Sequence, residues 1–117
     1  MPRLFLNQRE GTVLGSYILR ANRPGLGDHV ANAGFMVDPA ARGLGVGRTM
    51  GEHAMDEARR LGYRAMQFNF VVSTNESAVH LWERLGFRIV GTLPGAFRHA
   101  RKGLVDAYVM FRSLDDK

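Results

Sequence analysis

The sequence predicts a single α/β domain in which two helices accompany a mixed β-sheet. Three observations support this prediction. Segments rich in β-forming residues and segments with helical periodicity follow one another in the order β-β-β-α-β-α-β-β. Short turns join the first three strands, which is typical of an antiparallel meander. A glycine-rich turn at residues 43–47 separates the third strand from the first helix and predicts an anion site at the helix N-terminus.

The N-terminal half is defined by turn signals and β-forming runs. Strands are predicted at residues 3–6, 12–20 and 29–37, with a turn at 7–11 and a loop at 22–27. The first helix is predicted over residues 47–61. Its apolar residues recur at a spacing near four and form one face: Val46, Met50, Ala54, Ala58 and Leu61.

The C-terminal half continues the alternation of strands and helices. An apolar strand at residues 65–72 is expected to be covered on both faces. A short helix at 76–85 begins after Asn75, a residue type that caps helices. Two further strands are expected at 87–93 and 104–112, joined by a long basic loop.

Composition narrows the class of protein. The chain has 117 residues, 45% hydrophobic and 23% charged, as expected for one globular domain over residues 1–117. It has no cysteine, which rules out disulfides, thiolate metal sites and a cysteine nucleophile and fits a reducing compartment. We expect a cytoplasmic protein, and we expect no metal. No apolar run could span a membrane, so no membrane partner is expected.

The net charge of +5 predicts an anionic partner such as a phosphorylated cofactor. A nucleic acid is not expected, because aromatic residues are not interleaved with the basic ones. A P-loop would need a GxxxxGK[ST] pattern, which the chain lacks. A dinucleotide site would need an acidic residue after the next strand, where residues 72–75 read Val-Ser-Thr-Asn. A pyrophosphate site for coenzyme A is the third interpretation.

Two blocks carry a family resemblance. The pattern Arg42-x-x-Gly45-x-Gly47, after a strand that ends Val37-Asp38-Pro39, resembles the acetyl-CoA signature of the GNAT N-acetyltransferase superfamily. Residues 75–87 resemble that superfamily's N-x-x-A-x-x-L-[YW]-x-x-x-G-F block. The resemblance covers roughly residues 12–114. It implies a GNAT-like acyl-CoA N-acyltransferase fold that is short at the N-terminus and lacks the usual first strand and first helices. The exposed side of such a domain is expected to favour a homodimer.

The resemblance also implies where acetyl-CoA binds. Strands 33–37 and 66–71 would splay apart at their C-terminal ends, and the pantetheine arm would lie between them. The pyrophosphate would sit on backbone N–H groups of residues 43–48, and the thioester would lie level with residues 69–71. The implied cofactor-binding residues are Val37, Arg42, Gly43, Gly45, Val46, Gly47, Arg48, Asn75 and Trp82.

The function implied is N-acetylation of a primary amine of a small molecule by direct transfer from acetyl-CoA. A non-catalytic CoA-binding domain and a protein or peptide N-acetyltransferase are the alternatives. Trp82 stands where many family members have a tyrosine that protonates the leaving thiolate, and an indole cannot act as a general acid at ordinary pH.

The catalytic residues are not identified, and each candidate has a structural explanation beside the functional one. Asp38 could be a base or a turn-former before Pro39, and Asn75 could bind substrate or only cap its helix. Strand alternation puts Met66, Phe68 and Phe70 on one face and Gln67, Asn69 and Val71 on the other. Asn69 could therefore contact the acceptor amine or make a hydrogen bond within the core. An ordered water chain could equally replace a side-chain base.

Overall fold

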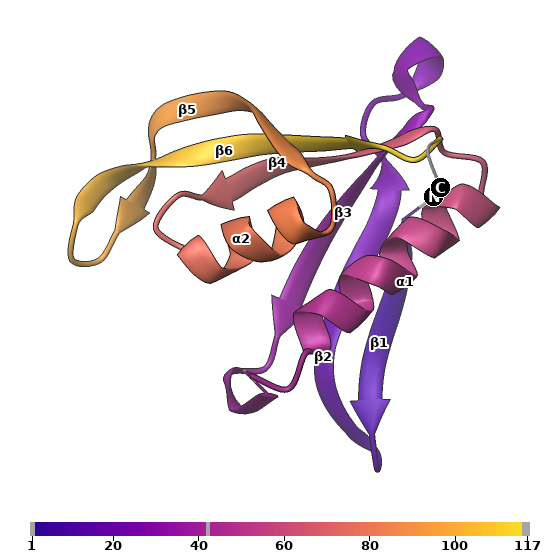
Figure 1. Ribbon diagram of the computed structural model, residues 1–117, viewed down its shortest axis with the longest axis horizontal. Helices are drawn as coiled ribbons and strands as arrows, with labels where there is room; N and C mark the ends of the chain where they lie inside the picture. Colours follow the sequence, from indigo (N-terminus) through magenta and orange to yellow (C-terminus); the bar gives the residue numbers. More distant parts are fainter. Residues whose placement is uncertain (1, 42, 116–117) are drawn as a thin grey trace.

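The computed structural model describes residues 2–41 and 43–115, which form one six-stranded mixed sheet with two α-helices (Figure 1). The strand order is β1-β2-β3-β4-β6-β5; β3 and β4 pair in parallel, and the other neighbouring strands are antiparallel. The predicted order of elements is confirmed. The elements are β1 (Arg3–Arg9), β2 (Thr12–Ala21), the 3-10 helix η1 (Gly25–Gly27), β3 (Val30–Val37), the 3-10 helix η2 (Pro39–Ala41), α1 (Val46–Arg60), β4 (Ala65–Val72), α2 (Glu76–Arg84), β5 (Arg88–His99) and β6 (Gly103–Ser113).

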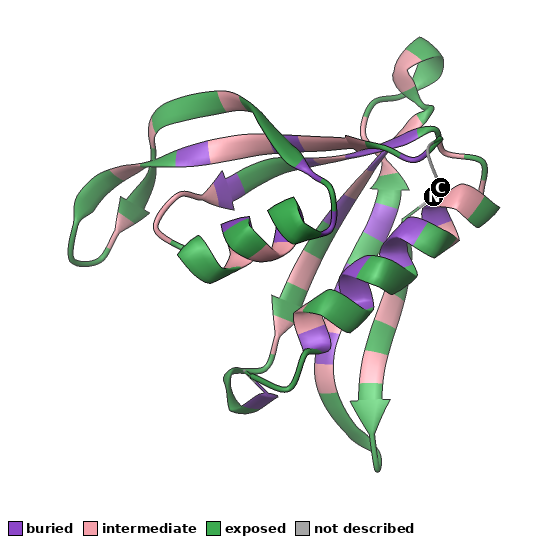
Figure 2. Ribbon diagram, viewed as in Figure 1, coloured by how far each residue is buried: buried purple, intermediate pink, exposed green. Residues whose placement is uncertain are grey.

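Both α-helices lie on the same side of the sheet and cover its core (Figures 1 and 2). The predicted apolar face of α1 is buried at Val46, Met50, Ala54 and Ala58, whereas Leu61 is only half-buried at the helix end. α2 buries Val79 and Trp82 beside β4. The strands contribute the alternate residues that point toward the helices: Tyr17, Leu19, Ala31, Ala33, Met66 and Phe68.

A bulge in β4 overturns the expected alternation. Phe68 pairs with Met110, but the next pair joins Val71 to Tyr108, so two residues on β4, Asn69 and Phe70, stand opposite one residue on β6. Val71 therefore turns into the core, while Phe70 is 49% exposed. The expectation that Phe70 shares the face of Phe68 is wrong, and so is the expectation that β4 is covered on both faces.

The long basic loop expected before β6 is also replaced by regular structure. β5 continues to His99 and pairs with β6 through Arg98 opposite Leu104, so only residues 100–102 form the turn. Nδ1 of His99 accepts hydrogen bonds from the backbone N–H groups of Arg101 and Lys102 and closes the turn. The basic side chains do not prevent a strand here, because β5 is an edge strand with exposed faces. β1 likewise extends to Arg9, beyond the predicted end at residue 6.

The sheet face away from the helices, called the open face below, carries exposed apolar residues. The register places Leu4 opposite Ile18, and Leu6 and Met36 opposite Ser16, so these residues share that face. Leu4 is 64% and Met36 75% exposed. The described part of the chain thus has a core on one side of the sheet and an uncovered apolar row on the other.

Candidate functional site

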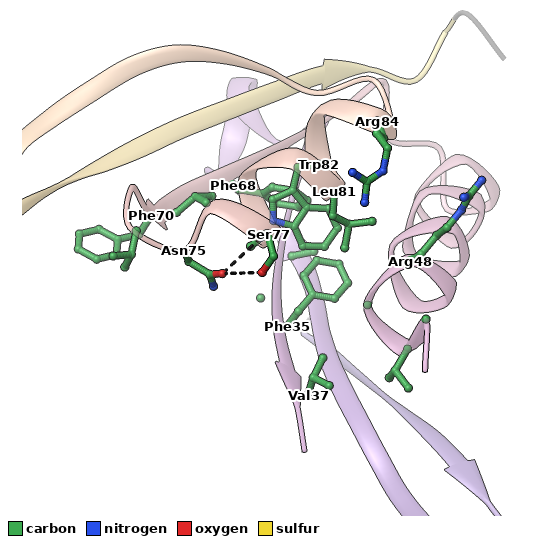
Figure 3. Close-up of a pocket in the computed structure, with 18 of the residues that line it drawn as sticks. Phe35, Val37, Arg48, Phe68, Phe70, Asn75, Ser77, Leu81, Trp82 and Arg84 are labelled. Atoms are coloured by element: carbon green, nitrogen blue, oxygen red, sulfur yellow. Dashed lines mark hydrogen bonds between the residues drawn. The ribbon is translucent and has the colours of Figure 1, made fainter. Parts of the chain in front are cut away.

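A cavity of about 920 Å³ lies between β3 and β4, and Figure 3 shows side chains that line it. Figure 1 shows the two strands diverging. The two strands pair at three positions, from Val30 opposite Ala65 to Asn32 opposite Gln67, and separate beyond them. The predicted splay of these strands is therefore present. It leaves the β3 edge near Val37 without a strand partner on the side of β4, so backbone groups there can bind an extended ligand.

The glycine turn forms one end of the cavity. Gly43 and Gly45 have φ angles of +84° and +75°, which favour glycine, and a Cβ atom on either would meet no other atom within 4 Å. Gly45 directly precedes α1, and no side chain caps that helix. The first N–H groups of α1 have no acceptor within the helix, and Val46, Gly47 and Arg48 of this first turn line the cavity. This arrangement of free donors and open space fits a pyrophosphate group.

The structure describes some, but not all, of the basic residues at this end of the cavity. Arg48 lines the cavity, with Nε 3.6 Å from a carboxylate oxygen of Glu52, and both side chains are exposed. Arg84 reaches the same cavity from the end of α2 (Figure 3). Arg42, which the signature assigns to cofactor binding, lies outside the described residues.

Asn75 caps α2, as predicted. Its Oδ1 accepts a hydrogen bond from the Ala78 backbone N–H at 3.3 Å and another from the Ser77 hydroxyl at 3.2 Å (Figure 3). Both bonds use the oxygen, which leaves the Nδ2 donors of Asn75 for another partner. Because Asn75 also lines the cavity, the capping role does not exclude contact with a ligand.

Trp82 lies in an aromatic cluster at the middle of the cavity. It is 7% exposed, and its ring centroid is 4.8 Å from that of Phe35 and 4.6 Å from that of Phe68. No described residue accepts a hydrogen bond from the indole N–H. Every fully buried side-chain nitrogen among the described residues has a hydrogen-bond partner, so the indole nitrogen is not fully buried. Because Trp82 lines the cavity, its N–H is accessible from there. It can donate a hydrogen bond to a ligand but cannot serve as a general acid.

Asn69 lies at the β4 bulge and lines the cavity. The side chain is exposed rather than buried in the core. Its Nδ2 donates to Oδ1 of Asn22 at 2.8 Å, and its Oδ1 accepts from Nε2 of Gln67 at 3.0 Å. The amide is therefore held by two other side-chain amides, not by core backbone.

The structure separates Asp38 from the other candidates. Its Oδ1 accepts a hydrogen bond from the Ala40 backbone N–H at 2.8 Å, which forms the turn at Pro39. Asp38 does not line the main cavity. Among the described residues, those that line this cavity include no Asp, Glu or His. Its described charged side chains are Arg20, Arg48 and Arg84, so the cavity suits an anionic ligand.

Among the described residues, the ionisable side chain with the largest pKa shift lies in the core. Burial raises the pKa of Tyr17 far above its usual range, and the nearby Glu57 carboxylate adds to the effect. The neutral Tyr17 hydroxyl shares a hydrogen bond with Nδ1 of His53. Neither residue lines the cavity, so this pair stabilises the packing of β2 against α1.

Several residues at the site were not predicted from the sequence. Arg20 and Asn32 line the cavity from β2 and β3, and they face each other in the register of those strands. Their only sequence signal is a polar residue in each of two predicted neighbouring strands. Phe35 and Ser77 also line the cavity, and Phe35 resembles any core residue of a strand.

Comparisons with a family model and with curated proteins both find acetyltransferases. The family model described as "Acetyltransferase (GNAT) family" matches residues 2–87. N-acetyltransferase aca1 of Schizosaccharomyces pombe is 38% identical over 109 residues, which cover 90% of this chain and 52% of that protein. The chain thus spans about half the length of this curated relative.

Two solved structures extend the similarity. A GCN5-related N-acetyltransferase from Kribbella flavida superposes with a TM-score of 0.92 at 52% sequence identity, over 96% of this chain and 67% of that one. The yncA structure from Salmonella typhimurium, which includes its cofactor acetyl-CoA, superposes with a TM-score of 0.85 at 26% identity, over 97% and 65%. Among the described residues, no helix is both long and apolar enough to cross a membrane.

Proposed function

The chain belongs to the acetyltransferase (GNAT) family, and we propose that it transfers the acetyl group of acetyl-CoA directly to a primary amine of a small molecule. One observation carries this proposal: a single cavity joins the glycine turn before α1 to the gap between β3 and β4. The turn suits the pyrophosphate, and the gap suits the extended arm that ends in the thioester.

The proposed roles at the donor end follow from backbone geometry. N–H groups of Gly43, Gly45 and the first turn of α1 bind the pyrophosphate, with Arg48 adding positive charge. The free edge of β3 near Val37 pairs with the pantetheine arm, much as a neighbouring strand would. Asn75 donates its Nδ2 hydrogen atoms to the same arm or to the acceptor.

Acetyl-CoA supplies an acetyl group that is already activated as a thioester. The amine nitrogen attacks the thioester carbonyl carbon, the C–S bond breaks, and the thiolate leaves. A backbone N–H group of Asn69 or Phe70, at the bulge where the register of β4 against β6 is interrupted, stabilises the oxyanion. Water takes the proton of the ammonium group and returns one to the thiolate, because the described cavity residues offer no carboxylate or imidazole. The indole N–H of Trp82 orients the reacting groups.

A non-catalytic CoA-binding domain is the second candidate, and Trp82 is the residue that favours it. A thiol with a pKa near ~8.5 is nevertheless a tolerable leaving group without a protein acid. A peptide or protein amine is the third candidate, and an acceptor panel with both small amines and peptides tests it.

The deciding experiment follows free thiol release from acetyl-CoA with a panel of amines and measures thermal stabilisation by CoA alone. We expect both stabilisation and turnover. Stabilisation without turnover of any amine would support the second candidate. No stabilisation at millimolar CoA would overturn both CoA proposals.

A homodimer remains part of the proposal, because the apolar row on the open face is uncovered in the described chain. Burial of a residue such as Met36 against a second copy would remove apolar surface from water. Sedimentation equilibrium measures the mass directly. A monomer at the highest concentrations would overturn this part and leave the proposed activity unaffected.

A further inference from the structure

We propose that Arg20 binds a carboxylate on the acceptor, so that the acceptors are small amines that carry a carboxylate, as amino acids do. This inference rests on the proposed function and adds the substrate class to it. Arg20, Asn32 and Asn69 line the end of the cavity that opens on the open face, and this group is called the open-face end below.

The strand register brings the polar residues of the open-face end together. Arg20 on β2 pairs with Asn32 on β3, and Asn32 pairs with Gln67 on β4, where the parallel pairing stops. Directly paired residues point to the same side of a sheet. The row therefore lies on the open face, at the point where β3 and β4 begin to diverge, whereas the helices occupy the other side.

The open-face end is far from the glycine turn. Val37 lies five positions after Asn32 in β3, which corresponds to about 16 Å along an extended strand. With the pyrophosphate at the glycine turn, the pantetheine arm beside Val37 and the thioester deeper in the gap, Arg20 is on the far side of the reacting carbon. An amine that enters from the open face would pass Arg20, so this guanidinium can contact the acceptor without contacting the donor phosphates.

The charges at this end select for an anionic group. Arg20 is exposed and forms no ion pair with any described residue. No described Asp or Glu lines the cavity, so a second ammonium group on an acceptor would find no carboxylate there. A guanidinium binds a carboxylate through two parallel hydrogen bonds, which fixes orientation as well as position. Diamines and polyamines are therefore poor acceptors, and amines with one carboxylate are good ones.

The amide side chains add an acceptor for the amine itself. Nδ2 of Asn32 donates to the Gln67 carbonyl oxygen at 3.1 Å, which fixes the amide orientation and leaves Oδ1 of Asn32 without a partner among the described residues. Oδ1 of Asn32 can accept a hydrogen bond from the amine of an acceptor whose carboxylate is held by Arg20. Asn69 forms hydrogen bonds with both Gln67 and Asn22, which fixes its amide beside Asn32.

The test compares acceptors that differ only in charge. Each amino acid of a panel is assayed beside its own carboxamide, with acetyl-CoA and thiol release as the readout. We expect the wild-type chain to prefer the carboxylate at least tenfold in kcat/KM. Arg20→Gln should bring that ratio close to one, and Arg20→Lys should restore it only in part because the ammonium group cannot form the paired bonds.

The controls separate this inference from the proposed function. Arg9→Gln removes an exposed arginine of β1 outside the cavity and should leave the ratio unchanged. Thermal stabilisation by CoA should be the same in wild type and Arg20→Gln. A wild-type chain that acetylates carboxamides or diamines as well as amino acids would overturn the inference and leave the proposed function intact. Preference for the carboxylate in Arg20→Gln at the wild-type level would also overturn it, and loss of CoA stabilisation in wild type would overturn the proposed function itself.

Discussion

The two ends of the cavity are built from different materials. The glycine-turn end is formed by the backbone of one continuous stretch before and into α1, with Gly43 and Gly45 in conformations that side chains disfavour. The open-face end is formed by side chains that three strands bring together, such as Arg20, Asn32 and Asn69. The first kind of site fails as a whole when its backbone is disturbed. The second kind should lose its function in steps, one side chain at a time.

Gly45→Val should produce the largest effect. The added side chain enters the space proposed for the pyrophosphate, and the φ angle of +75° adds backbone strain of roughly 1–2 kcal/mol. We expect CoA affinity to fall more than about a hundredfold, measured by calorimetry, since several charge-assisted hydrogen bonds are lost together.

Gly25→Val is the matched control for this prediction. Gly25 has a φ angle of +66° and open space around its Cβ position, but it lies outside the cavity. It should cost similar stability and leave CoA binding unchanged. Equal losses of CoA affinity in both variants would mean that backbone strain, and not a side chain in the proposed pyrophosphate site, explains the result.

The pH dependence of transfer is the next largest effect. Since no described Asp, Glu or His lines the cavity, the fraction of neutral amine should control the rate. That fraction rises about tenfold for each pH unit below the pKa of the amine, which is near ~10 for an alkyl amine. kcat/KM should therefore rise with pH up to that pKa. A plateau that begins near pH 7 for every amine tested would reveal a protein base and contradict the water route.

Asn75→Asp separates the two roles of Asn75. Aspartate caps helices as well as asparagine does, so the melting temperature should stay within a few degrees of wild type. The lost Nδ2 donor should raise KM for acetyl-CoA or the acceptor about tenfold. Asn75→Ala is the comparison, and it should also lose about 1 kcal/mol of stability. Unchanged kinetics in Asn75→Asp would reduce Asn75 to a helix cap.

Trp82→Tyr should raise kcat about fivefold over Trp82→Phe. The two variants leave similar space beside Phe35 and Phe68, but only the tyrosine hydroxyl can protonate a thiolate. Steady-state rates and melting temperatures of both variants provide the measurement. Identical kcat values would show that water alone supplies the proton even when an acid is present.

Asn69→Ala should have the smallest effect. It breaks the side-chain bonds to Asn22 and Gln67 without touching the glycine turn. We expect kcat/KM for the acceptor to fall about threefold and CoA stabilisation to stay the same. A larger loss of CoA binding than of acceptor selectivity would contradict the separation of the two ends.

The difference between a site built from one continuous stretch and a site built from several strands also explains which features could be predicted from the sequence. The glycine turn, the Asn75 cap and the element order are local patterns, so their positions follow from neighbouring residues along the chain. The bulge in β4 is not local, because it depends on where β6 pairs with Phe68 and Val71. The pairing of Arg20 with Asn32 depends on strand register. A shift of one strand by one residue would move its side chains to the other face of the sheet.

Errors in the C-terminal hairpin have a related cause. Basic residues such as Arg98 and Arg101 suggest a loop when they are considered alone. At an edge strand they are compatible with regular pairing, and the positive φ of Gly103 lets the chain turn within three residues. Exposure at a sheet edge is a property of the whole fold, so local composition predicts a loop where the structure has a strand.

The short parallel pairing between β3 and β4 also has a mechanical consequence. In the sheet, three residue pairs join one unit, made of β1, β2 and β3, to a second unit, made of β4, β5 and β6. Side-chain packing of Phe35 against Trp82, and of α1 against α2, joins the same units below the sheet. Opening of the backbone between the units should therefore begin beyond Asn32, where the strands no longer pair, and a ligand that bonds to both strands there would add a backbone connection between the units. Their amide hydrogen exchange should then become cooperative, with both units opening together rather than separately.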